Sequence, residues 1–233
     1  MVNEPVPRWG LGYVQASQVL LSRNPRPEPA GLDFAAAIEQ VTSDYIVGWA
    51  ATEDGMKGSP NTQPFRFRSW IYAQTGASAL EDIKPLTEHM PGYLQRSIRG
   101  KTDAEVFFHL FLAMLHDSGK LNDPDLDPDV IRLALRDAVV MVGRLLDRDA
   151  TGDFGNVVVS NSRSMVVAHL AGNPVFLRHL RNEDPKLSEN QRYRAVLAVD
   201  SADKPGDGFE AIPMGSALII DRAVSARIAP VQA

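Results

Sequence analysis

The stretch from Asn61 to Glu105 contains the segments Asn61-Thr62-Gln63-Pro64-Phe65, Trp70-Ile71-Tyr72-Ala73-Gln74-Thr75-Gly76 and Gly100-Lys101-Thr102-Asp103-Ala104-Glu105. The apolar middle segment predicts a buried strand that stops at a glycine turn. Thr102 and Glu105 form a capping box, in which each side chain bonds the other's free backbone N–H and fixes where a helix begins. The helix behind this box has a broad apolar stripe made of Val106, Phe107, Leu110, Phe111, Met114 and Leu115. We therefore expect a buried helix packed on a sheet.

Strand and helix patterns alternate before and within this stretch. Apolar residues separated by turn residues predict strands, and apolar residues on one helical face predict amphipathic helices. The expected elements are a hairpin over 9–14 and 18–21, a helix capped by Asp33 and ending near Ser43, a buried strand over 45–49, two strands over 65–73 and a short helix over 80–89.

A second long helix and a series of strands follow. Asp127-Pro128 starts the helix, because proline is favoured in a first helical turn. The expected strands are 156–159 and 165–168 as a hairpin, 175–177, 193–199, 217–220 and an edge strand in the tail from Ala223. Strands, two adjacent helices and further strands predict an α+β protein with two antiparallel sheets and helices packed outside.

Composition limits the classes of function. The 233 residues suit one domain, with residues 1–8 as an N-terminal tail. A net charge of -5 without a basic block disfavours nucleic acid and anionic membranes. No apolar run is long enough for a membrane span and no signal-peptide pattern is present, so we expect a cytoplasmic protein. The chain has no cysteine, which excludes disulfides, thiolate metal sites and a cysteine nucleophile from these residues.

The ordered series of motifs resembles the class II glutamine amidotransferases, which are N-terminal-nucleophile (Ntn) hydrolases. The strand Trp9 to Tyr13 is similar to their Gly-Trp-Gly-Ile-Gly-Tyr strand, and residues 46–52 are similar to their strand ending in Arg-x-Ala-Thr. Asn61 to Phe65 resembles Asn-x-His-Pro-Phe, Tyr72 to Gly76 resembles Phe-Ala-His-Asn-Gly, and Gly100 to Glu105 resembles Gly-x-Thr-Asp-Ser-Glu. The resemblance extends over about residues 9–228 and implies a four-layer αββα sandwich.

The same resemblance implies a degenerate substrate pocket. In the family an N-terminal cysteine is the nucleophile, an Asn side chain and a Gly N–H form the oxyanion hole, an Arg pairs with the glutamine carboxylate and an Asp holds its ammonium group. Here Trp49 occupies the Arg position, Thr75 the Asn position, and Gln63 and Gln74 replace the two motif histidines. The pocket residues carried over are Asp103, Gly76, Thr75, Trp49, Thr52 and Thr102. We assign no catalytic residue, no cofactor and no metal.

Each of these residues also has a structural interpretation. Asp103 suits the first turn of a helix, where the helix dipole stabilises an acid, and Gly76 suits a turn at a strand end. Trp49 suits a buried strand, although its ring is also a stacking surface for a planar ligand. His109 and His116 are about two helical turns apart, which is too far for one metal ion. Thr75 or Ser78 as a nucleophile lacks a neighbouring histidine to activate it.

Three functions follow from the sequence. The preferred prediction is a domain without glutaminase activity that acts as a binding or regulatory partner, either for glutamine or an amino-acid-like ligand or for another subunit. The alternatives are an active glutamine amidotransferase whose catalytic cysteine precedes Met1, and a pocket recast for another acyl or amide reaction. The family's first strand is expected to be missing or replaced, because eight residues precede Trp9. Its loss would leave a sheet edge bare, which predicts a homo- or hetero-oligomer.

Overall fold

The computed structural model describes residues 8–25, 34–51, 56, 58–76, 83–147, 149–182 and 193–231. Three features predicted from the sequence therefore lie outside the described residues: the helix cap Asp33, the pocket residue Thr52 and the beginning of the helix expected from Leu80. Ser78, named above as a candidate nucleophile, also lies outside them.

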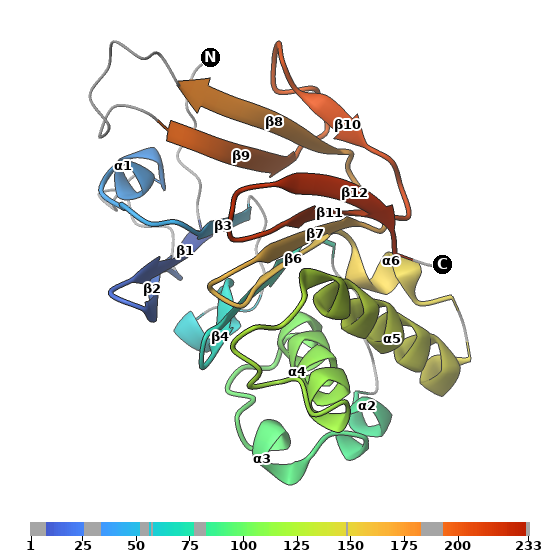
Figure 1. Ribbon diagram of the computed structural model, residues 1–233. Helices are drawn as coiled ribbons and strands as arrows, with labels where there is room; N and C mark the ends of the chain where they lie inside the picture. Colours follow the sequence, from blue (N-terminus) through green and yellow to red (C-terminus); the bar gives the residue numbers. More distant parts are fainter. Residues whose placement is uncertain are drawn as a thin grey trace.

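A six-stranded antiparallel sheet forms the centre of the molecule (Figure 1). Its strand order is β12-β11-β7-β6-β5-β4. The strands are β4 (Phe65–Phe67), β5 (Trp70–Gln74), β6 (Val157–Ser160), β7 (Met165–His169), β11 (Ser216–Ile220) and β12 (Ala226–Pro230). The pairs expected over 65–73 and over 156–168 are confirmed, as is the edge strand in the tail.

Two three-stranded antiparallel sheets lie against this sheet, with the orders β2-β1-β3 and β10-β8-β9. Their strands are β1 (Arg8–Gln15), β2 (Gln18–Asn24), β3 (Ile46–Ala51), β8 (Val175–Asn182), β9 (Tyr193–Asp200) and β10 (Glu210–Ile212). The β1–β2 hairpin turns at Ala16 and Ser17, both of which have positive φ angles, as a type I′ hairpin turn requires.

The long helices are α4 (Asp103–Asp117) and α5 (Pro128–Leu146), and both begin where the sequence predicts. Thr102 caps α4 and Asp127 caps α5 with their side-chain oxygens. The shorter helices are α1 (Phe34–Glu39), η1 (Ser59–Asn61), α2 (Lys84–Glu88), α3 (Gly92–Gln95) and α6 (Thr151–Phe154). No helix in the described part of the chain is long and apolar enough to span a membrane.

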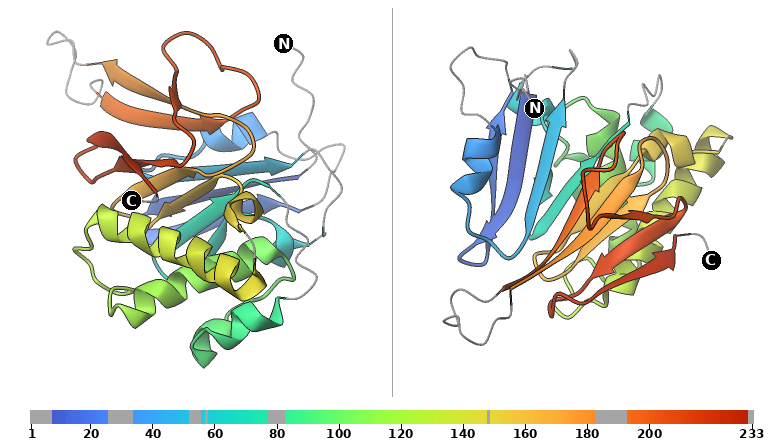
Figure 2. Two further views of the ribbon diagram at one scale, coloured as in Figure 1. Left: turned by 90° about the vertical axis from the view of Figure 1, so that its right-hand side faces the viewer. Right: turned by 90° about the horizontal axis from the view of Figure 1, so that it is seen from above.

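Side chains along the strands of the six-stranded sheet alternate between its two faces, and each face packs against a different layer. Val157 and Val159 of β6 pack in the core beneath α4 and α5, whereas Val158 packs against the three-stranded sheets. On the outer side, Trp9 and Leu11 of β1 pack with α1, and the ring centroids of Trp9 and Phe34 are 5.9 Å apart. Figure 2 shows β1, β2 and β3 beside α1 and away from α4 and α5. The expected α+β fold, an αββα sandwich of antiparallel sheets, is confirmed, and one of its sheet layers is divided in two.

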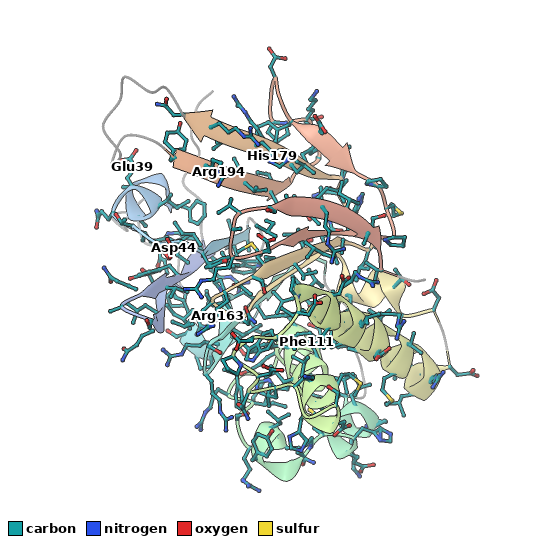
Figure 3. The ribbon with its side chains drawn as sticks, viewed as in Figure 1. Glu39, Asp44, Phe111, Arg163, His179 and Arg194 are labelled. Atoms are coloured by element: carbon teal, nitrogen blue, oxygen red, sulfur yellow. The ribbon has the colours of Figure 1, made fainter. Side chains whose placement is uncertain are left out.

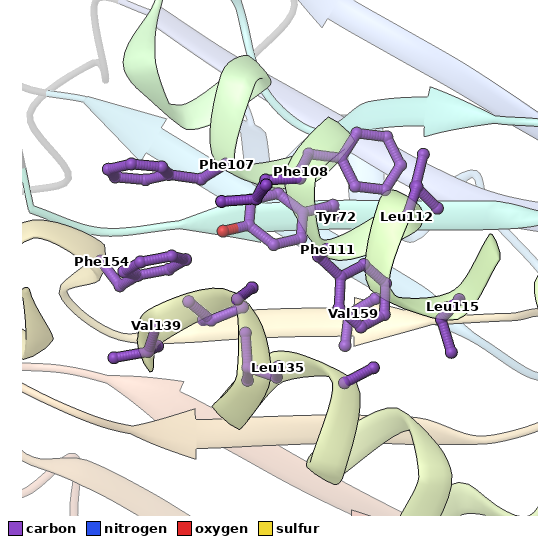
Figure 4. Close-up of a cluster of buried hydrophobic side chains, with 14 of the residues drawn as sticks. Tyr72, Phe107, Phe108, Phe111, Leu112, Leu115, Leu135, Val139, Phe154 and Val159 are labelled. Atoms are coloured by element: carbon purple, nitrogen blue, oxygen red, sulfur yellow. The ribbon is translucent and has the colours of Figure 1, made fainter. Parts of the chain in front are cut away.

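The main core lies between the six-stranded sheet and the helices. Tyr72 of β5 stacks on Phe108 of α4 with ring centroids 5.1 Å apart, and Phe107 stacks on Phe154 at 4.2 Å (Figure 4). These rings are fully buried. Away from this core, Gly10 lets the backbone of Gln63 come close to β1. A Cβ at Gly10 would lie 2.0 Å from the Gln63 carbonyl oxygen.

Four local predictions need correction. The helix over 34–39 ends before Ser43, and β10 lies where only a turn was expected. The strand predicted as buried, β3, has one buried residue, Val47, because β3 is the outer strand of its sheet. The capping box is only half formed: Thr102 Oγ1 accepts from Glu105 N at 3.3 Å, but the Glu105 carboxylate accepts from Arg99 N and Gly100 N.

Candidate functional site

A cavity of about 1140 Å³ lies between the six-stranded sheet and the two three-stranded sheets. Its floor is apolar and includes Ala73, Val158, Met165 and Val167, which belong to β5, β6 and β7. Charged residues also line it, and Figure 3 labels three of them, Asp44, Arg163 and Arg194. The size slightly exceeds the range of roughly 300–1,000 Å³ that is usual for small-molecule pockets.

The walls of this cavity are the edges of two strands. Consecutive residues of β3, Ile46 to Trp49, line one side, and consecutive residues of β9, Arg194 to Ala198, line the other. Side chains alternate between the two faces of a strand, so a strand that presented a face would contribute every second residue. Contributions from consecutive residues indicate that the edges of β3 and β9 border the cavity. Both are outer strands of their sheets.

A polar network closes one end of the cavity. Thr75 Oγ1 donates to Asp200 Oδ2 at 2.7 Å, and Asn156 Nδ2 donates to the same oxygen at 2.6 Å. Asn173 Nδ2 donates to Asp200 Oδ1 at 3.1 Å. The Asn156 side chain also binds the Asn173 carbonyl at 2.7 Å and accepts from Leu170 N at 3.2 Å. The network joins the end of β5, the start of β6 and the end of β9.

Tyr45 makes a contact at another part of the rim. Its hydroxyl donates to the Arg163 carbonyl in the β6–β7 turn. Burial raises the pKa of Tyr45, and the nearby carboxylates of Asp44 and Asp221 raise it further. Ser43 Oγ bonds the backbone of Val14 and so ties the segment before β3 to the β1–β2 hairpin. The Tyr45 bond therefore ties the segment before β3 to the six-stranded sheet, and the Ser43 bonds tie the same segment to β1.

Of the pocket residues predicted from the sequence, Trp49 and Thr75 line the cavity. The Arg8 guanidinium carbon lies 5.2 Å from the centroid of the Trp49 ring, so a cation–π contact occupies part of this aromatic surface. Gly76 is adjacent to Thr75 and has φ +91, which favours glycine. Its backbone packs against Gly155, since a Cβ at Gly76 would lie 3.1 Å from the Gly155 Cα.

Thr102 and Asp103 do not line the cavity and lie at the start of α4, on the helical side of the central sheet. Asp103 Oδ1 accepts from Ala104 N at 2.8 Å. Burial raises the pKa of Tyr72 well above its usual value, and the charge of Asp103 adds to this shift. The residues carried over by resemblance are therefore divided between two sides of β5.

The two glutamines at the motif histidine positions make structural contacts. Gln63 Oε1 accepts from Gln74 N at 2.7 Å, and Gln63 Nε2 donates to Gln74 O at 3.0 Å. The peptide bond between Gln63 and Pro64 is cis. Gln74 Oε1 accepts from the Tyr72 hydroxyl at 2.6 Å. Gln63 thus pairs with the backbone of β5 as a neighbouring strand would.

His109 and His116, which the sequence places on one helix, have separate surroundings. His109 is buried, and its Nδ1 lies 2.8 Å from the Glu105 carbonyl oxygen. His116 Nδ1 lies 3.0 Å from the Tyr93 hydroxyl at the surface. Within the described residues no group of three His, Cys, Asp or Glu side chains is arranged to hold a metal ion.

The sequence patterns do not single out Asp200 and Asn156 as site residues. Each is a polar residue directly beyond an apolar run, at the end of β9 and at the start of β6. Polar residues at strand ends commonly belong to turns, so this signal alone does not separate them from other loop residues. Their importance depends on a contact with Thr75, and this contact arises only when three strands meet.

Comparison with known proteins identifies the fold. No protein-family model and no curated protein sequence matches this chain. A glutamine aminotransferase class-II domain protein from Silicibacter pomeroyi is 17% identical with a TM-score of 0.63, over 97% of this chain and 92% of that one. A predicted glutamine amidotransferase from Pseudomonas aeruginosa is 14% identical with a TM-score of 0.59, over 94% and 86%. Glutamine phosphoribosylpyrophosphate amidotransferase from B. subtilis is 14% identical with a TM-score of 0.57, over 98% of this chain and 44% of that one.

The layers and these likenesses together show that the chain has the fold of the solved class II glutamine amidotransferase structures. The resemblance seen in the sequence motifs is thereby confirmed at the level of the fold. At 14–17% identity these likenesses show a shared fold. The function of this protein therefore has to be argued from the residues of its own cavity.

Proposed function

We propose that this protein is a cytoplasmic binding module that has the class II glutamine amidotransferase fold but does not hydrolyse glutamine. The 233 residues contain no thiol for a covalent thioester intermediate. The cavity between the sheets is the binding site in this proposal, because it combines an apolar floor with polar groups at its rim. A partner polypeptide or an amino-acid-like ligand is the class of molecule bound.

One observation carries the proposal. Thr75, at the position of the oxyanion asparagine by resemblance, directs its hydroxyl proton to Asp200 at 2.7 Å. The same hydroxyl oxygen accepts from Asn156 N at 3.3 Å. An oxyanion hole needs donors aimed at the place where negative charge develops, and removal of one such donor costs about 2.7–4 kcal/mol of transition-state stabilisation. A hydroxyl that donates to a carboxylate does not serve as such a donor.

The same contact favours a second candidate, a hydrolase with Thr75 as nucleophile and Asp200 as base. A nucleophile within hydrogen-bonding distance of a carboxylate is the first requirement of such chemistry. We rank this candidate lower because the Asp200 oxygens also accept from Asn156 Nδ2 and Asn173 Nδ2. With these amide donors in place the carboxylate is held as a structural acceptor, and no histidine is among the described residues that line the cavity.

Ammonia release from glutamine by the purified protein tests the proposal. We expect no release above a heat-inactivated sample, and release above that level would contradict the binding role. Incubation with p-nitrophenyl acetate followed by intact-mass measurement tests the second candidate. An acetyl adduct that disappears in Thr75→Val would establish Thr75 as a nucleophile. Thermal shifts with glutamine and glutamate then show whether an amino acid stabilises the folded protein.

A further inference from the structure

Two strand edges face each other across the cavity. Within the described residues β3 pairs with β1 alone and β9 pairs with β8 alone. The N–H and C=O groups of a strand point alternately to its two sides, so the groups of β3 that β1 does not use point away from β1. The corresponding groups of β9 point away from β8. Unpaired backbone groups on a strand edge are a template for another strand.

The cavity floor lies beneath the junction of the two three-stranded sheets. Val158 and Met165 each pack against both apolar clusters, the one under β8 and β9 and the one under β1 and β3. Both side chains are only partly buried, although they occupy the middle of the central sheet. The floor is therefore an apolar surface with a strand edge on either side of it.

We propose that the cavity binds an extended segment of a partner protein, which inserts as a β-strand between β3 and β9. The inference rests on the binding role proposed above and names the class of partner. The inserted segment would pair with β3 on one side and with β9 on the other. Its alternate side chains that face Val158 and Met165 are apolar, because they cover an apolar floor.

The length of the two walls distinguishes a peptide from an amino acid. The four residues of β3 that border the cavity span about 13 Å at the rise of a strand, and the five residues of β9 span about 16 Å. A free amino acid has one ammonium and one carboxylate group and does not pair with runs of this length. An extended peptide offers a donor and an acceptor at every second residue to each wall.

The described strands also favour a partner over a second copy of this chain. Among the described residues the other outer strands are β2, β4, β10 and β12. Each already belongs to a sheet, so its insertion into another copy would break its hydrogen bonds with the neighbouring strand of its own chain. For β12 this includes five residue pairs with β11 and the hydrogen bond from Arg132 to the Pro230 carbonyl.

Hydrogen exchange with defined peptides tests the insertion. The probes are acetylated and amidated octapeptides Lys-X-Thr-X-Thr-X-Thr-Lys, in which X is Val, Ile, Leu or Phe. Control peptides carry N-methyl groups at the X residues and at the Thr residues, which remove the strand donors to both walls and keep the side chains. We expect at least one probe to slow amide exchange in both β3 and β9, and its N-methylated form to slow neither.

A floor variant gives a second readout. Val158→Phe places a larger side chain in the cavity, and we expect peptide affinity measured by fluorescence polarisation to fall at least about tenfold. Val140→Phe, on the exposed face of α5, is the matched control and keeps the affinity. Circular dichroism reports whether each variant is folded. The exchange experiment uses the unaltered chain, so it decides the proposal even if Val158→Phe does not fold.

Several outcomes would contradict the proposal that a peptide strand inserts between β3 and β9. These are binding by no peptide of the panel, protection of only one of the two edges, and equal binding of the N-methylated peptides. Protection of both edges that grows with protein concentration and needs no peptide would assign the site to a second copy. Ammonia release from glutamine by the same sample would instead contradict the proposed function, so the two failures are distinguishable.

Discussion

Thr75 Oγ1 and Asp200 Oδ2 form a 2.7 Å hydrogen bond between residues that are 125 positions apart in the sequence. The bond joins the end of a central strand to the end of β9, which belongs to a different sheet. Asn156 adds a second bond to the same oxygen at 2.6 Å. Among the described residues β9 is an outer strand that pairs only with β8, so this contact helps to fix the position of β9 and of the cavity wall that it forms.

Replacement of Asp200 by alanine is therefore expected to destabilise the protein by about 1–3 kcal/mol, since it leaves several partly buried donors without an acceptor. Thr75→Val removes one of these donors and is expected to cost about 1 kcal/mol. In a double-mutant cycle the two changes should be clearly non-additive, because the residues are in contact. Chemical denaturation at neutral pH measures the four unfolding free energies of the cycle, those of the unaltered protein, the two single variants and the double variant.

Thr151 and Asp149 form the matched control for this pair. Thr151 Oγ1 also donates to an aspartate at 2.7 Å, but the pair is exposed and its members are two residues apart. We expect no measurable change in stability on Thr151→Val. An effect as large as that of Thr75→Val would mean that a threonine–aspartate bond has the same value at any position, and the role assigned to the cavity network would be wrong.

Gly155 permits the contact between the ends of β5 and β6. It has φ +55, and a Cβ there would lie 1.7 Å from the Thr75 carbonyl oxygen. Gly155→Ala is expected to cost at least about 2 kcal/mol, because backbone strain and a backbone clash act together. Thermal unfolding measures the loss. Gly152→Ala, three residues earlier with no atom within 4 Å of the added Cβ, should leave the melting temperature nearly unchanged.

The buried His109 predicts a dependence of stability on pH. Burial lowers the pKa of His109, and the hydrogen bond with the Glu105 carbonyl only partly opposes this shift. The unfolded chain therefore binds a proton more readily than the folded chain. The stability from this group is complete above pH 6.5 and is lost as the pH falls toward the lowered folded value. The unfolding free energy changes by at most about 1.4 kcal/mol per pH unit for one proton.

Urea unfolding between pH 7.5 and pH 5 measures this slope, and we expect His109→Leu to reduce it. His116→Leu is the control, because this histidine lies two turns further along α4 and is exposed. Its loss leaves the contribution of His109 in place. A slope that His109→Leu does not change would show that the buried imidazole does not take part in the acid sensitivity.

Local sequence patterns specified most of the elements. The caps Thr102 and Asp127 mark the starts of α4 and α5, because an N-cap acts on backbone groups two or three residues away. The alternation over 156–168 marks a hairpin for the same local reason. The buried character of β3 was predicted wrongly, because exposure depends on which strand is its neighbour. Which strands pair depends on residues from the whole chain, so the apolar run Ile46-Val47 does not indicate that β3 is an outer strand.

The site was less predictable than the fold. Motif resemblance located Trp49 and Thr75, which both line the cavity. It did not distinguish them from Asp103, which lies on the other side of the central sheet. Spacing along the chain does not show on which side of β5 a residue lies. The local signal at Asp200, a polar residue at the end of an apolar run, does not single it out, because its role depends on the Thr75 hydroxyl, 125 positions away.

Glu105 provides the last prediction, because it is a buried acid that holds the loop before α4. Its carboxylate accepts from Arg99 N at 2.9 Å and from Gly100 N at 2.5 Å. Glu105→Ala leaves both backbone donors without this acceptor, and we expect a loss of about 2 kcal/mol or more at pH 7. The control Glu88→Ala removes an exposed acid from α2 and should change stability little, since its contact with Lys84 is a surface ion pair.

The pH dependence separates loss of a buried, titrating carboxyl group from a general loss of packing. Burial raises the pKa of Glu105, and the two backbone donors oppose that shift without cancelling it. A raised folded pKa means that the folded state holds the proton more tightly, so this contribution to stability is present below pH 4.5 and is lost as the pH rises through the folded value. The stability difference between the native protein and Glu105→Ala should therefore be larger at pH 4 than at pH 7. A difference that stays constant over this range would mean that Glu105 acts through its size alone.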